Sequence, residues 1–170
     1  MERTASRPLP SGRLAQRQVI AFGLATVVLG FGYLAVAVNS LTAGLGLLTW
    51  VLYVLIYTPL KSHSPANTFV GAISGALPAL MGWTAMGAPL GLEAATLFLI
   101  LFLWQFPHFM AIAWIYRRQY ETAGLKMLTV VDPSGLRAGA QAVIAALALI
   151  PISLVPALSP MADSVGIYTF

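Results

Sequence analysis

The chain has 170 residues, of which 59% are hydrophobic and 8% charged, and its formal net charge is +4. Soluble domains are about 45–50% apolar and about 25% charged, so this composition excludes a soluble globular domain and indicates that lipid covers much of the surface. The absence of cysteine excludes disulfides and thiolate metal sites. The nine basic residues lie outside the apolar segments, a placement that indicates membrane topology rather than nucleic-acid binding.

Five apolar segments approach or exceed the length of about 20 residues that a helix needs to cross a bilayer. We expect Pro59 to end the second of them at Thr58, because proline has no N–H donor and clashes with the preceding turn. The prolines inside the third and fourth segments are tolerated in membrane helices. The predicted fold class is all-α, a polytopic membrane helix bundle in which residues 1–170 form one partial domain. The expected helices cover about 19–38, 41–58, 68–86, 92–116 and 138–158.

All nine basic residues fall on one side of this arrangement. Four precede the first helix, Lys61 follows the second, and four lie between the fourth and the fifth. Short cytoplasmic loops carry the excess of Lys and Arg in membrane proteins. We therefore expect the N-terminus and the loops 59–67 and 117–137 to be cytoplasmic, in a bacterial-type plasma (inner) membrane.

Polar side chains that suit phosphate recognition collect on the same side. Arg3 and Arg7 are spaced by four residues before two prolines, and guanidinium groups offer paired donors to phosphate oxygens. Lys61 and Asn67 lie near the start of the third helix, where free N–H groups favour an anion. Topology alone also explains the arginines, and Asn67 or Thr68 equally suits a helix cap.

The fourth helix carries polar residues at membrane depth. Gln105 and His108 are spaced by three, which places them on one helical face, and Trp104 is among the aromatic residues around them. Polar groups in a bilayer are costly unless they face a cavity or a partner. We expect the wall of a cavity for a large, partly polar ligand, with hydrogen bonding between helices as the alternative. For His108, a haem ligand, a proton donor and a structural residue all stay open.

The segment after the fourth helix adds further donors. Arg117 and Lys126 are expected to hold an anion, with Tyr120 between them, although basic and aromatic residues also anchor helices at the interface. No pair of aspartates at helical spacing occurs, so the chain has no complete carboxylate site for Mg²⁺.

The chain resembles the protoheme IX farnesyltransferases, or haem O synthases, a family within the UbiA superfamily of intramembrane prenyltransferases. The family protein is longer, with about nine helices around a membrane cavity. The stretches that carry the resemblance are Met1 to Leu9, Tyr57 to Thr68, Gly71 to Thr84, Trp104 to Phe109, Tyr120 to Gly124 and Met127-Leu128.

The resemblance implies transfer of a farnesyl group from farnesyl diphosphate to a vinyl group of haem B, which makes haem O for terminal oxidases. It implies Mg²⁺ as cofactor, the lipid bilayer as environment, and haem A synthase or terminal oxidase assembly as partners, with no nucleic acid. On this basis the catalytic candidates are Lys61, Arg3 and Arg7. The diphosphate-binding candidates are Arg3, Arg7, Lys61, Asn67, Arg117 and Lys126, and the haem or prenyl cavity candidates are Trp104, Gln105, His108 and Tyr120.

The chain departs from the family pattern at two places. The family's first Asp-rich motif lies ahead of the residues that match Met1 to Arg7 and is not in this chain, and the acidic residue that precedes the tyrosine matching Tyr120 is replaced by Gln119. The metal ligands are therefore unknown, and we expect a fragment, truncated at both ends, of a longer enzyme, with a degenerate, inactive copy as the alternative. Alternatives are a prenyltransferase with another acceptor, such as a quinone precursor or chlorophyllide, a membrane transport module, and an assembly subunit of an oxidase.

Overall fold

The computed structural model describes residues 2–158 and the side chains of residues 4–158. All regular structure in this range is helical, and five helices are long and apolar enough to cross a membrane. The predicted fold class, an all-α bundle with five membrane helices, is confirmed. The spans are α2 (Gln16–Ala37), α3 (Ser40–Trp50) with η1 (Val51–Tyr57) and α4 (Thr58–Leu60), α5 (Asn67–Ala85), α6 (Leu92–Ile115), and α9 (Leu136–Leu154) with η2 (Val155–Leu158).

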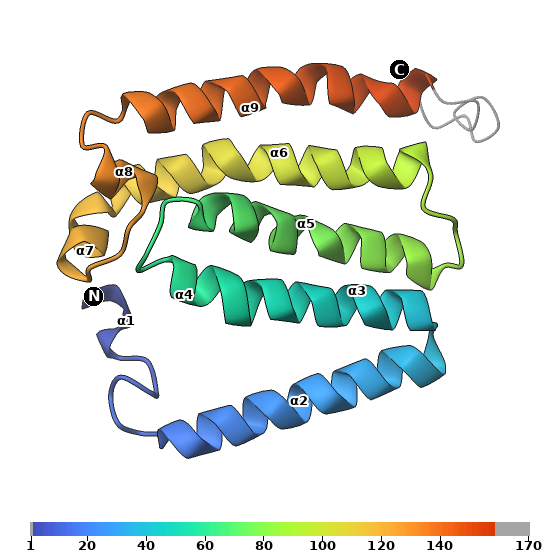
Figure 1. Cartoon of the computed structure of the whole chain (residues 1–170), viewed down its shortest axis with the longest axis horizontal. Helices are drawn as coiled ribbons and strands as arrows, with labels where there is room; N and C mark the ends of the chain where they lie inside the picture. The colour runs from blue at the N-terminus through green and yellow to red at the C-terminus, as the bar shows by residue number, and fades with distance from the viewer. Residues whose placement is uncertain (1, 159–170) are drawn as a thin grey trace.

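The spans lie side by side in chain order, each packed against the next (Figure 1). Connections at alternating ends of the bundle join neighbouring spans, the longest running from α6 to α9, so successive spans run in opposite directions (Figure 1). Three short helices, α1 (Glu2–Ala5), α7 (Arg117–Thr122) and α8 (Leu128–Val131), lie at the end where the chain enters α2 (Figure 1). We call this end, formed by residues 2–15, 61–66 and 116–135, the basic end.

The second span does not end at Thr58, as the proline rule predicted, but runs on to Leu60. Its last turns before Pro59 widen into a π-helix, in which the Thr58 N–H and Oγ1 both donate to the Tyr53 carbonyl oxygen. In an α-helix the ring of Pro59 would meet the carbonyl four residues earlier. Wider π-type turns change that spacing, and helical geometry continues past the proline to Lys61.

The middle span α5 is the most buried of the five and packs on both α3 and α6. Small residues such as Gly71, Ala72 and Ala76 form its buried side, and Ala72 contacts the Phe106 and Ala145 cluster. Small side chains let membrane helices approach closely, which raises the van der Waals contact between them. The first turn of α5 is thereby held between its neighbours at the basic end.

The start of α9 is fixed by a polar turn. Asp132 accepts hydrogen bonds from the Ser134 hydroxyl at 2.5 Å and from the Arg137 N–H at 3.0 Å. Gly135 has a φ of 74°, a left-handed conformation that favours glycine, and the Trp114 ring lies 2.6 Å from the place where a Cβ would be. This turn sets where α9 begins relative to the end of α6.

Candidate functional site

Three of the predicted site residues are joined directly at the basic end. The Lys126 N–H donates a hydrogen bond of 2.6 Å to the Lys61 carbonyl oxygen. Asn67 Nδ2 donates to the Lys126 carbonyl oxygen at 3.2 Å. The loop after α4, the first residue of α5 and the loop after α7 therefore form one cluster, although 65 positions separate its first and last members (126 minus 61).

Asn67 links these loops and does not cap a helix. Its side chain is fully buried, and Nδ2 also donates to the Ser64 carbonyl oxygen at 2.7 Å. The N-cap of α5 is Ala66, and no side chain caps it, so the alternative explanation of Asn67 or Thr68 as the cap is wrong. An amide that donates to two carbonyls of separate segments fixes their distance, because both bonds must be satisfied in a buried place.

Lys61 presents a partly desolvated ammonium group. The residue is half-buried, and its Nζ lies 4.1 Å from the centroid of the Tyr57 ring. Burial lowers the pKa of Lys61 below its ordinary value, because water stabilises the charged form less there. In such a setting an ammonium attracts an anion more strongly than it would in bulk water.

A pocket of about 130 Å³ lies beside the cluster. One side of it is polar, with the Asn67 amide and two tyrosines, and the other side is apolar, from α6. The lining therefore matches a ligand with a polar group joined to an apolar one. The residues that line it are Tyr57, Asn67, Thr68, Phe109, Ile112, Tyr120 and Met127.

Arg117 does not join Lys126, contrary to the expectation that the two hold one anion. Its guanidinium lies 4.3 Å from the Trp114 ring centroid, and Nη1 donates to the Trp114 carbonyl oxygen at 3.0 Å. It lines a separate pocket of about 180 Å³ with Arg118 and Glu121. Arg7 is exposed within the segment before α2, and the side chain of Arg3 lies outside the described residues.

Gln105 and His108 do not share one lining, although their spacing predicted it. Gln105 is buried between helices, where Nε2 donates to the Ala72 carbonyl oxygen of α5 at 3.0 Å. His108 is exposed and stacks on Trp104, with ring centroids 4.9 Å apart. Gln105 therefore forms a hydrogen bond between helices, which was the alternative to a cavity wall.

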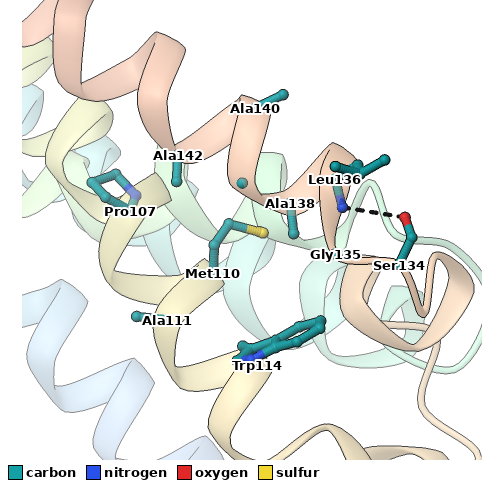
Figure 2. A pocket seen from close by; sticks show the side chains of 11 residues that line it. Pro107, Met110, Ala111, Trp114, Ser134, Gly135, Leu136, Ala138, Ala140 and Ala142 are labelled. Carbon is teal, nitrogen blue, oxygen red and sulfur yellow. Dashed lines mark hydrogen bonds between the residues drawn. The ribbon is translucent and has the colours of Figure 1, made fainter.

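A larger cavity of about 540 Å³ lies between α6 and α9 and contains none of the predicted site residues. Figure 2 shows Met110 and Trp114 of α6 facing Ala138 and its neighbours on α9 across it. Its walls are almost entirely apolar and rich in alanine. Alanine on a helix gives no signal that separates a cavity wall from helix packing, so sequence reasoning missed this cavity.

The oxygen ligands present do not form a magnesium site by themselves. Within residues 2–158, no group of three or more His, Cys, Asp or Glu is placed to hold a metal ion. Gln119 Oε1 is buried without a hydrogen-bond partner, and it is an oxygen of the kind that Mg²⁺ accepts. However, Glu121, the nearest carboxylate in the chain, is exposed, and Mg²⁺ sites beside phosphates use one or two carboxylates. The described residues therefore do not fit Mg²⁺ on their own.

Comparison with known proteins assigns the chain to a family. The chain is 51% identical to the protoheme IX farnesyltransferase of Solibacter usitatus over 95% of its length and 55% of that protein's. It is 47% identical to the protoheme IX farnesyltransferase of Koribacter versatilis, over 92% of the chain and 50% of that protein. It is 44% identical to that of Rhodopirellula baltica, over 94% of the chain and 56% of that protein. The chain thus spans about half the length of these curated relatives, and no solved structure matches it. Because the profile of the UbiA prenyltransferase family matches residues 1–170, and because five apolar helices accompany that match, the chain is an integral membrane protein of the UbiA prenyltransferase family.

Proposed function

We propose that residues 1–170 are part of one prenyltransferase domain that transfers a farnesyl group from farnesyl diphosphate to a vinyl group of haem B. The product would be haem O, used by terminal oxidases. The observation that carries this proposal is the cluster of Lys61, Asn67 and Lys126 beside a pocket with one polar and one apolar side. The similarity to proteins named protoheme IX farnesyltransferase supports the choice of substrates.

The proposed chemistry needs charge stabilisation more than any other help. The bond between the farnesyl carbon and the diphosphate oxygen breaks, and both electrons leave with the diphosphate. Lys61 and Lys126 stabilise that growing negative charge. The vinyl carbon of haem B attacks the allylic cation, and water adds to the cation that remains on the haem side chain, losing one proton. Arg3 and Arg7, which precede α2 at the same end, are proposed to add further positive charge.

Asn67 and Tyr120 have supporting places in this proposal. Asn67 holds the two lysine-bearing loops together, so it orients Lys61 and Lys126 rather than contacting the reacting bond. Tyr120 lines the pocket with Tyr57 and is proposed to face the substrate's polar end. Arg117, which packs on Trp114 and lines a separate pocket, has no direct part in this proposal.

Mg²⁺ accompanies diphosphate substrates in members of this family generally. Such an ion neutralises phosphate charge when it is bound. Because the described residues do not fit it alone, the charge stabilisation proposed for this part of the domain rests on Lys61 and Lys126.

The exposed aromatic surface of α6 is proposed to face the acceptor. Trp104 and His108 are stacked within 14° of parallel and form a flat aromatic surface, which suits packing against a porphyrin. Haem A synthase or terminal oxidase assembly would then receive the product. We further propose that the basic end is cytoplasmic, in the inner membrane of a bacterium, because every basic residue with a described side chain lies at or beside it.

The first test is binding of radiolabelled farnesyl diphosphate to the purified chain in detergent. We expect saturable binding that inorganic diphosphate displaces and that Lys61→Gln weakens at least tenfold. Arg17→Gln, at the start of α2, is the charge-matched control and should bind like the unsubstituted chain. The second test is mass spectrometry for haem O in cells that lack haem O synthase and express the chain. Absence of saturable binding would contradict the proposed site, and a prenylated product other than haem O would identify a different acceptor.

A further inference from the structure

The Tyr57 ring contacts both α5, at Gly71, and the ammonium group of Lys61. A Cβ atom on Gly71 would lie 2.8 Å from Tyr57 Cε2, so the ring fills the space that only a glycine leaves open. The Lys61 Nζ lies 4.1 Å from the centroid of the same ring. Because Gly71 is buried and the Tyr57 ring packs against it, the ring has a defined position.

The local helix geometry brings the two side chains together. Tyr57 is the last residue of the π-helix, and Lys61 follows it by four positions. The Lys61 N–H donates to the Tyr57 carbonyl oxygen at 3.2 Å, so the two residues are one α-helical turn apart and share a face. Tyr53 packs on Tyr57 with ring centroids 5.2 Å apart and limits its movement from the membrane side.

A lysine side chain has four rotatable bonds, and an exposed ammonium samples many positions. The face of an aromatic ring attracts a cation and so favours the ammonium position above the ring. Within residues 4–158 the Lys61 Nζ donates no hydrogen bond, and the Tyr57 ring is its close partner. The ring can therefore fix where the positive charge stands while leaving its N–H donors available to an anion.

We infer that Tyr57, seated against Gly71, is a positioning residue that holds the Lys61 ammonium where it meets the diphosphate of the substrate. This inference rests on the proposed function for its ligand. Because the interaction uses the ring face, the phenol hydroxyl is not required. Phenylalanine at position 57 should therefore preserve the effect, and leucine should abolish it.

The geometry can be tested without any ligand, because the chain has only two lysines, Lys61 and Lys126. In a sample labelled with ¹³C at the lysine ε-carbon, we expect the Lys61 ε-protons to show an upfield ring-current shift and Lys126 to serve as internal reference. The shift should persist in Tyr57→Phe and disappear in Tyr57→Leu. An unshifted Lys61 signal in the unsubstituted chain would overturn the inference.

Glycine variants separate positioning from a general packing role. Gly71→Ala should displace the ring and change the Lys61 signal. Gly82→Ala is the matched control, because it lies in the same helix and nothing is within 4 Å of its added Cβ. If Gly71→Ala and Gly82→Ala leave the Lys61 signal equally unchanged, Gly71 does not seat the ring.

Binding of farnesyl diphosphate then tests the consequence. We expect Tyr57→Phe to bind within about twofold of the unsubstituted chain, and Tyr57→Leu and Gly71→Ala to bind about fivefold more weakly, as the range of cation–π energies suggests. Helical circular dichroism and the midpoint of thermal unfolding check that each variant folds. If a folded Tyr57→Leu binds as tightly as the unsubstituted chain, the inference is wrong.

The two sets of measurements distinguish two kinds of failure. If the unsubstituted chain does not bind farnesyl diphosphate, the proposed function fails, and the lysine signals alone decide whether Tyr57 places Lys61. If the chain binds and Lys61→Gln weakens binding, but Tyr57→Leu does not, the proposed site stands and the positioning role of Tyr57 falls.

Discussion

Gly75 of α5 lies directly against the side-chain amide of Gln105 on α6, so that a Cβ atom at position 75 would overlap Gln105 Oε1. The same amide donates through Nε2 to the Ala72 carbonyl oxygen, one turn earlier in α5. A buried polar side chain and a glycine thus form one contact between two neighbouring helices at the centre of the bundle. This contact explains why a polar residue is retained at membrane depth without a ligand.

Gly75→Ala should destabilise the chain, because Gln105 would have to leave its place or the helices would separate. We expect the free energy of unfolding to fall by about 1–3 kcal/mol, the usual cost of overpacking. Gly82→Ala in the same helix has open space around its Cβ and should change stability by less than about 0.5 kcal/mol. Denaturant unfolding in detergent, followed by helical circular dichroism, measures both. Equal stabilities of the two variants would show that Gln105 adapts freely.

Gln105 and His108 should respond differently to truncation, since only Gln105 is buried. Gln105→Ala loses the hydrogen bond to α5 and leaves a space, and we expect a loss of about 2 kcal/mol or more in the free energy of unfolding. His108→Ala removes an exposed ring and should leave unfolding nearly unchanged. If the Trp104–His108 surface faces the acceptor, His108→Ala should instead weaken haem binding, measured by the Soret absorbance during titration. Unchanged haem affinity would remove His108 from the proposed acceptor surface.

Asn67 should matter for both stability and ligand binding. Asn67→Ala removes two donated hydrogen bonds, to Ser64 and Lys126, and should cost about 1–3 kcal/mol. Asn67→Asp should cost more at neutral pH, because a carboxylate would face two carbonyl oxygens. Both variants should weaken binding of farnesyl diphosphate, since the loop that carries Lys126 is no longer fixed to α5. A variant that is destabilised but binds normally would limit Asn67 to a structural role.

Lys61 gives the site a pH dependence on the alkaline side. Burial lowers the pKa of Lys61 below its ordinary value of 10.5, so the ammonium loses its proton at a lower pH than a solvated lysine does. We expect the affinity for farnesyl diphosphate to fall as pH rises through that lowered pKa. Lys61→Arg keeps its charge over the whole range, so any binding it retains should not show this fall. An identical alkaline profile in Lys61→Arg would mean that another group is responsible.

Asp132 gives the start of α9 a pH dependence on the acid side. The hydrogen bond from the Ser134 hydroxyl, followed by the bond from the Arg137 N–H, holds the pKa of Asp132 below its ordinary value of 3.8. A lowered carboxyl pKa contributes stability that is present above the unfolded pKa and lost as pH falls through the folded one. The unfolding midpoint of the unsubstituted chain should therefore exceed that of Asp132→Ala at neutral pH, and the difference should shrink below about pH 4. A difference that does not depend on pH would assign the effect to packing.

The membrane character and the five spans were predictable from the sequence, because hydropathy over about 20 residues is set by composition alone. The place of the basic residues was also predictable, since alternating spans put every such loop at one end. Pro59 was misjudged, because the proline rule describes an α-helix and the chain instead widens into π-type turns before the proline. The family followed from ordered motifs, and the similarity over 95% of the chain confirms it.

Which polar residues meet was decided by tertiary structure alone. Helical spacing placed Gln105 and His108 on one face of the helix. A separation of three residues still leaves an angle between the two side chains, and the packing of α5 buries Gln105 and leaves His108 exposed. Arg117 and Lys126 were expected together, yet Arg117 packs on Trp114. The link from Asn67 to Lys126 spans 59 positions and depends on how α5 and α6 pack. Sequence by itself determined which segments enter the membrane, because that depends on each segment's own transfer free energy. The contacts between segments depend on shape, and only the packed helices supply it.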